Sequence, residues 1–110
     1  SSPNIVNLPL PKLTDGPAFR AAVTQHWLPR LDAFAPELVM ISAGFDGHAE
    51  DDMAHFNLHT ADFGWITRHL HDLAVRHAHE RIVSCLEGGY ELNALGRCVS
   101  THVDELIGHA

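Results

Sequence analysis

The sequence of 110 residues predicts an α/β protein in which a parallel sheet is flanked by helices in three layers. Two apolar runs, residues 38–41 and 82–85, are continuous, as is typical of strands buried on both faces of a parallel sheet. Each run follows a segment with helical periodicity, and a further helical segment closes the chain. This alternation predicts right-handed crossovers between parallel strands.

The N-terminal elements are expected in the following order. Residues 4–11 begin as a short strand that Pro9 and Pro11 end, because proline cannot donate to a sheet ladder. The first helix should start at residues 14–17, where a capping side chain precedes a proline. Pro29 should bend this helix or mark a change of segment. The apolar stripe of the helix comprises Phe19, Val23, Trp27, Leu31 and Phe34.

The C-terminal elements are a helix over residues 60–79, a strand over 82–86 and a closing helix over 93–107. One face of the helix over 60–79 comprises Phe63, Ile66, Leu70, Leu73 and His77. The closing helix is expected to bury Leu95, Val99, Val103 and Leu106.

These elements are too few to complete a domain. A three-stranded parallel sheet has two exposed edges and needs helices on both faces, which three helices barely cover. Residues 1–110 are therefore expected to be one segment of a longer α/β domain. The isolated segment is expected to self-associate, because unpaired strand edges recruit other chains.

Composition narrows the classes of function. Hydrophobic residues make up 45% of the chain and charged residues 19%, which is typical of a globular protein. The net charge of -7 has the wrong sign for nucleic-acid phosphates, and no apolar stretch approaches the ~20 residues of a membrane helix. Because the N-terminus lacks the features of a secretion signal, a cytoplasmic protein with free, buried Cys85 and Cys98 is expected.

Two common kinds of site are disfavoured by residue spacing. No Gly-x-Gly-x-x-Gly loop follows a strand, which argues against a dinucleotide-binding domain. The ten histidines lack the His-Glu-x-x-His spacing that places two metal ligands on one helical face. Most are interpreted as solvated or helix-end residues, namely His26, His69, His71, His77, His79, His102 and His109.

Two loops carry the residues that suggest chemistry: SAGFDGH at residues 42–48 and LEGGY at residues 86–90. Each directly follows an apolar run, so both should leave from the same edge of the sheet, where open α/β folds bind ligands. Asp46 could ligate a divalent metal, act as a base or cap the next segment. Two glycines could let Tyr90 swing its hydroxyl into a crevice, where it would polarise a carbonyl. The alternative is a glycine turn followed by a tyrosine that packs on the core.

The two loops, together with FNL at residues 56–58 and the continuation of the second loop to LEGGYEL at 86–92, resemble the C-terminal third of the histone deacetylase superfamily. The Glu-Gly-Gly-Tyr form is similar to the class II-like and bacterial branch, which includes acetylpolyamine amidohydrolases and acetoin-utilisation proteins. The resemblance implies an arginase/deacetylase-like fold. It also implies a zinc-dependent amidohydrolase that releases acetate and a free amine from acetyl-lysine or acetylpolyamines.

The resemblance assigns roles to individual residues. Asp46 is implied to be a zinc ligand, and Tyr90 the hydroxyl that stabilises the oxyanion. Gly88, Gly89 and Met53 are implied to contact the substrate. The catalytic histidine pair and the other two zinc ligands of the family lie upstream of this segment, so the segment alone is expected to be inactive. His48 is interpreted as a residue that packs within its loop.

Two questions stay open at the level of sequence. A non-catalytic interaction or regulatory module could retain the same fold and loops, and a His-His pair with an Asp-x-His motif upstream would favour the enzyme. The acidic run Glu50, Asp51 and Asp52 could favour cationic amides at a pocket rim, or could be an ordinary solvated loop.

Overall fold

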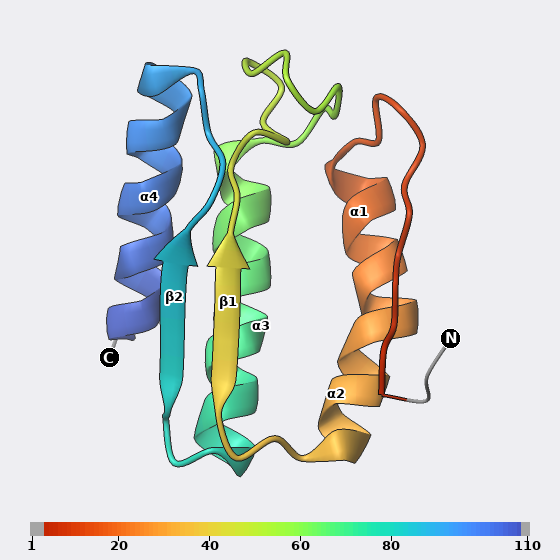
Figure 1. Cartoon of the computed structure of the whole chain (residues 1–110), viewed down its shortest axis with the longest axis vertical. Coiled ribbons are helices and arrows are strands. Elements are labelled where there is room, and N and C mark those ends of the chain that lie inside the picture. The colour runs from red at the N-terminus through yellow and green to blue at the C-terminus, as the bar shows by residue number, and fades with distance from the viewer. Residues whose placement is uncertain (1–3, 109–110) are drawn as a thin grey trace.

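The computed structural model describes residues 4–108 and confirms the α/β class with parallel strands. β1 and β2 pair in register from Val39 opposite Ile82 to Ala43 opposite Leu86. In Figure 1 the strands lie in front of α3 and α4, and the N-terminal helices stand beside α3. No helix within residues 4–108 is long and apolar enough to cross a membrane. The elements are α1 (Gly16–Ala22), the π-helical turn η1 (Val23–Trp27), α2 (Leu28–Phe34), β1 (Val39–Ala43), α3 (Thr60–His77), β2 (Ile82–Leu86) and α4 (Leu92–Ile107).

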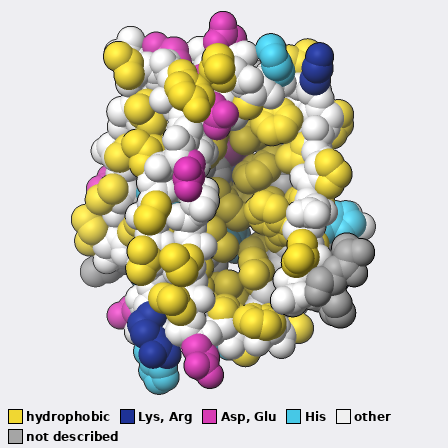
Figure 2. Space-filling view, in the orientation of Figure 1, with side chains coloured by type: hydrophobic (Ala, Val, Ile, Leu, Met, Phe, Trp, Pro, Cys, Tyr) yellow, Lys and Arg dark blue, Asp and Glu magenta, His cyan; other side chains and the backbone are white. Residues whose placement is uncertain are grey.

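Helices cover one face of the sheet within residues 4–108. Val39 packs with Leu73 of α3 on the covered face, whereas Met40 on the opposite face is 71% exposed. Figure 2 shows hydrophobic side chains over this open face. The prediction that both strands are buried on both faces is therefore wrong for this chain, because one of the three expected layers is not part of it. An open sheet face is what a partial domain would show, and self-association of the segment stays a prediction.

The prediction of a short strand at residues 4–11 is wrong. Residues 5–11 pair with neither strand, and the sheet described here has two strands instead of three. The segment lies along the N-terminal helices (Figure 1), where the indole Nε1 of Trp27 donates to the carbonyl of Val6 at 3.2 Å. Pro9 and Pro11 cannot donate to a ladder, so a side-chain contact from a helix replaces sheet pairing.

The first helix starts after Asp15, whose carboxylate caps it as predicted. Pro29 has no N–H to donate to a carbonyl one turn earlier. The helix accommodates this missing donor because the turn before Pro29 is wider than an α-helical turn. In this turn, η1, the Leu28 N–H bonds to the Val23 carbonyl. The predicted change of segment at Pro29 is confirmed. Phe34, at the end of the expected apolar stripe, is instead 69% exposed.

The inward face of α4 differs from the predicted one. Ala94, Cys98 and His102 are buried, whereas the residues expected there are half-buried or, for Val103, exposed: Leu95, Val99, Val103 and Leu106. Close packing of α3 against α4 explains the difference. A Cβ atom on Gly64 of α3 would lie 2.7 Å from Cγ2 of Thr101. At such a separation the small side chains Ala94 and Cys98 fit against α3, whereas His102 is accommodated by hydrogen bonds to Thr67 and Ser84.

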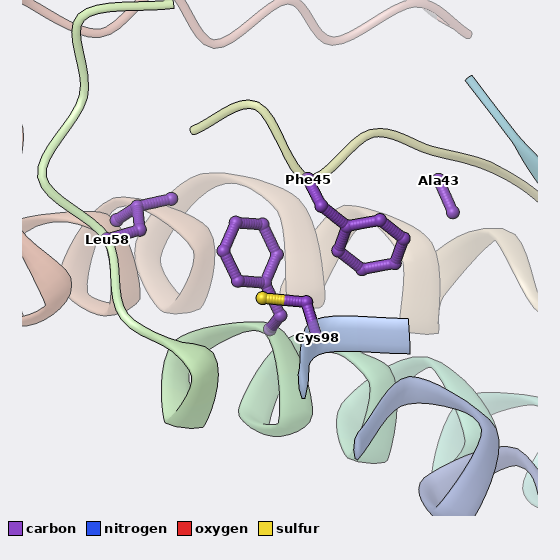
Figure 3. Packing of buried hydrophobic residues seen from close by; sticks show 5 residues of the cluster. Ala43, Phe45, Leu58 and Cys98 are labelled. Atoms are coloured by element: carbon purple, nitrogen blue, oxygen red, sulfur yellow. The ribbon is translucent and has the colours of Figure 1, made fainter. Parts of the chain in front are cut away.

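The core connects the first candidate loop to both C-terminal helices. The ring of Phe45 meets that of Phe63 edge to face, with centroids 5.3 Å apart. Cys98 is fully buried in this cluster, as predicted, but Cys85 is exposed, which corrects the expectation of two buried thiols. The cluster, shown in Figure 3, comprises Ala43, Phe45, Leu58, Phe63 and Cys98.

His102 is buried, which corrects its interpretation as a solvated histidine. Its Nδ1 lies 2.7 Å from Oγ1 of Thr67, and that hydroxyl already donates to the Phe63 carbonyl. Nδ1 therefore carries the proton, and Nε2 accepts from the Ser84 hydroxyl at 2.8 Å. The neutral ring satisfies every partner, and burial lowers the pKa of His102 below its ordinary value of 6.5.

We expect stability to fall as the pH drops below about 6.5, because the unfolded chain then binds a proton that buried His102 does not. The loss is about 1.4 kcal/mol for each pH unit between the unfolded and folded pKa values. Urea unfolding of His102→Gln should show a weaker dependence of stability on pH below about 6.5. His26→Gln, at an exposed position, should keep the dependence of the unchanged protein. An unaltered dependence in His102→Gln would contradict a neutral, buried ring.

Candidate functional site

The two candidate loops are joined by hydrogen bonds at the carboxyl ends of β1 and β2. The Phe45 N–H donates to the Gly88 carbonyl at 2.8 Å, and the Glu87 N–H donates to the Ala43 carbonyl at 2.9 Å. These bonds extend the parallel pairing beyond the strands. The expectation that both loops share one edge of the sheet is therefore confirmed, and this edge is where α/β folds carry their chemistry.

Asp46 is half-buried and lies against the second loop. A Cβ atom on Gly88 would lie 2.9 Å from Oδ1 of Asp46, and one on Gly44 would lie 3.2 Å from the same oxygen. Both positions are glycine, so the carboxylate can lie directly against the backbone of each loop. The structure thus brings Asp46 and Gly88 together, and their assigned roles stay predictions.

Tyr90 is 59% exposed, so the alternative that it packs on the core is not what the structure shows. Gly89 has a φ of 141°, a conformation that favours glycine, and a Cβ atom there would lie 2.6 Å from Cδ1 of Leu95. This backbone conformation directs the chain outward just before Tyr90. Met53, the remaining predicted substrate contact, is 60% exposed. Contact of Gly88, Gly89 and Met53 with substrate stays a prediction, as does the catalytic role of Tyr90.

Asp51 was missed by sequence reasoning as a residue of the site. Its side chain is 4% exposed and accepts three backbone hydrogen bonds. Oδ2 accepts from the N–H groups of Tyr90 at 2.6 Å and Glu91 at 2.9 Å, and Oδ1 accepts from that of Met53 at 3.0 Å. Asp51 therefore links the loop that follows Asp46 to the loop that carries Tyr90.

The charge of Asp51 is stabilised in this position. Burial raises the pKa of the carboxyl, but the backbone donors of Met53, Tyr90 and Glu91 outweigh burial and hold the pKa below its ordinary value. The carboxylate is thus ionised near neutral pH. It functions as an acceptor for the two loops, and its charge is not displayed to solvent.

This geometry corrects the expectation of a three-residue acidic rim. Asp51 is buried, and Glu50 forms an ion pair with Arg97 of α4. Asp52 is the one residue of the run that is exposed without an ion pair among the described contacts. Attraction of cationic substrates by this run is therefore weaker than the sequence suggests.

His48 packs within its loop, as the sequence interpretation has it. It is 2% exposed, its ring stacks on Phe63 at 6.4 Å, and its Nε2 lies 3.3 Å from Oγ1 of Thr60. Its Nδ1 accepts the Glu50 N–H, and burial lowers the pKa of the imidazole. A neutral ring that already has partners at both nitrogens holds the loop between Asp46 and Asp51 in shape.

The described residues supply one candidate ligand for a metal ion, Asp46, but not a complete metal site. A carboxylate at the mouth of a sheet edge is a suitable oxygen donor for zinc. Within residues 4–108, however, no three His, Cys, Asp or Glu side chains are arranged to hold a metal ion. Asp46 would therefore need ligands from other segments of a longer protein.

Fold and loops together define a class of protein: an α/β chain with candidate functional residues after two adjacent parallel strands. Comparison with known proteins makes the class specific, because the histone deacetylase domain matches residues 1–106. The chain is 38% identical over 107 residues to type-2 histone deacetylase 2 of Dictyostelium discoideum. It is 36% identical over 104 residues to the histone deacetylase-like amidohydrolase of Pseudomonas aeruginosa. The chain belongs to the histone deacetylase family.

Solved structures agree with this assignment. The HDA15 HD domain superimposes with a TM-score of 0.81 over 90% of this chain at 27% identity. The histone deacetylase Clr3 superimposes with a TM-score of 0.80 over 91% of the chain at 25% identity.

The chain spans only part of each of these relatives. The two sequence matches cover 94% and 93% of this chain, but 6% of the Dictyostelium protein and 27% of the Pseudomonas protein. The structural matches cover 27% of the HDA15 chain and 16% of the Clr3 chain. The fold described here is accordingly a partial α/β unit of the larger deacetylase domain.

Proposed function

We propose that this chain is the C-terminal part of a zinc-dependent deacetylase that hydrolyses the acetamide of acetyl-lysine or an acetylpolyamine. Membership in a family of deacetylases and amidohydrolases supports a hydrolase. The observation that carries the proposal is the pairing of the two loops, in which the Phe45 N–H bonds to the Gly88 carbonyl. Asp46 and Tyr90 then follow on loops that are joined to each other.

In this proposal each residue has a separate task. Asp46 would supply a carboxylate oxygen to zinc, which when bound activates water and polarises the amide. The Tyr90 hydroxyl would donate a hydrogen bond to the acetamide oxygen as negative charge develops on it. Gly88 and Gly89 would let the backbone approach the substrate, and Met53 would contact the acylated side chain.

The segment alone is proposed to be inactive, because Asp46 is its one assigned zinc ligand and three protein ligands hold a catalytic zinc. To test this, zinc content and turnover of acetyl-lysine peptides and acetylpolyamines would be measured for the full-length protein and for this chain in parallel. We expect zinc and turnover in the full-length protein and neither in the chain.

The alternative of a non-catalytic interaction module is decided by the same measurement. A folded full-length protein that holds no zinc and turns over neither amide would favour that module and contradict the deacetylase. Turnover by the chain alone would contradict its proposed inactivity.

A further inference from the structure

We propose that Asp51 is the positioning residue that sets the direction of Tyr90 for deacetylation. The proposal rests on the proposed function, in which the Tyr90 hydroxyl acts on the acetamide. Asp51 would not touch the substrate and would act through the backbone of the LEGGY loop.

Apart from the bond of the Phe45 N–H to the Gly88 carbonyl, two residues earlier, Tyr90 has few other constraints. Its side chain is 59% exposed, and within residues 4–108 no hydrogen bond to its hydroxyl is formed. The two residues before it, Gly88 and Gly89, have more backbone freedom than any other residue type. An exposed phenol that follows two glycines would sample many directions unless the backbone beside it were held.

Asp51 holds this backbone at two consecutive peptide groups. Its Oδ2 accepts the N–H of Tyr90 at 2.6 Å and that of Glu91 at 2.9 Å. Two bonds to adjacent N–H groups fix the orientation of the peptide planes on both sides of the Tyr90 Cα, and hence the direction of its Cα–Cβ bond, from which the side-chain rotamers extend. The carboxylate is 4% exposed, and charge-assisted hydrogen bonds shielded from water are strong ones.

Both ends of this link are anchored. The Asp51 N–H donates to the carbonyl of buried His48 at 2.9 Å, which fixes the carboxylate relative to the loop of Asp46. Glu91 caps α4, and its side chain accepts the Ala94 N–H at 2.7 Å. Asp51 therefore places Tyr90 between a packed loop and the first turn of a helix.

A double-mutant cycle in the full-length protein tests the proposal through Asp51→Asn, Tyr90→Phe and their combination. Asparagine keeps the shape but removes the charge and one acceptor oxygen. We expect Asp51→Asn to lower kcat by up to about 100-fold, which a misplacement of ~1 Å can cause, with KM and zinc content nearly unchanged. In the Tyr90→Phe background the same change should lower kcat little further, because the positioned hydroxyl is already absent.

Asp52→Asn is the matched control, since it removes the same charge from the exposed neighbour and should leave kcat unchanged. Asp51→Asn could instead lower kcat equally in the unchanged protein and in Tyr90→Phe, or could lower zinc content in parallel with kcat. Either result would show a general structural role for Asp51 and overturn the positioning proposal. The proposed function would stand. An unchanged kcat in Tyr90→Phe would overturn the positioning proposal together with the role of the Tyr90 hydroxyl, whereas absence of turnover in the unchanged full-length protein would overturn the proposed function. If Asp51→Asn does not fold, Asp51→Glu replaces it in the cycle, and failure of both to fold also overturns the proposal.

Discussion

Replacing Asp46 by alanine in the full-length protein is expected to abolish zinc binding and deacetylation together. A catalytic zinc is held by three protein ligands, so the loss of one carboxylate leaves the site incomplete. The Asp46 side chain is half-buried against Gly44 and Gly88, and alanine fits the same space without a clash. We therefore expect the fold to survive while zinc content, measured by elemental analysis, and turnover both fall to background.

Asp52→Ala is the control for this experiment, because it removes an exposed carboxylate from the same loop and should leave zinc content and turnover intact. If Asp46 instead only caps its turn, Asp46→Ala would lower the free energy of unfolding and leave zinc content unchanged. Full zinc occupancy in Asp46→Ala would contradict its role as a ligand.

Tyr90→Phe is expected to reduce kcat by roughly 10²- to 10³-fold, or ~2.7 to 4 kcal/mol in the barrier, which is typical when one oxyanion donor is lost. The substitution removes a single hydroxyl from an exposed side chain, so zinc content and the free energy of unfolding should stay unchanged. Steady-state kinetics on an acetyl-lysine peptide would measure the effect.

The split between kcat and zinc content distinguishes Tyr90 from Asp46. A silent Tyr90→Phe would mean that the hydroxyl has no part in the reaction, and a loss of zinc would mean that Tyr90 supports the metal site.

The sequence predicts the order of most elements because their hydrophobic patterns are local. The helix expected over residues 60–79 is found as α3, and the strand expected at residues 82–86 is β2. The prediction of a strand at residues 4–11 is wrong because a strand requires a partner strand, and a local hydrophobic pattern does not specify one. Coverage of the sheet is mispredicted for the same reason: the apolar residue Met40 indicates burial, yet it is 71% exposed, and the local pattern does not specify which element would cover it.

The candidate site is predictable where its chemistry follows a motif and unpredictable where it depends on long-range contacts. Asp46 and Tyr90 stand out as candidates because each follows a strand within a glycine-containing loop, and their roles stay predictions. Asp51 was missed because nothing in the run Glu50, Asp51, Asp52 indicates which side chain turns inward. Its partners Tyr90 and Glu91 lie 39 and 40 residues away, so only the folded chain reveals the contact.

Asp46 is proposed to contribute a carboxylate to a zinc site beside the loop of Tyr90. Anomalous X-ray diffraction at the zinc absorption edge, from crystals of the full-length protein, tests it most directly. We predict a zinc peak about 2.0–2.2 Å from a carboxylate oxygen of Asp46, the usual zinc to carboxylate distance. A zinc peak that is coordinated by other residues, with Asp46 unbound, would contradict this role of Asp46. Well-ordered crystals that hold no zinc at this edge of the sheet would contradict it as well.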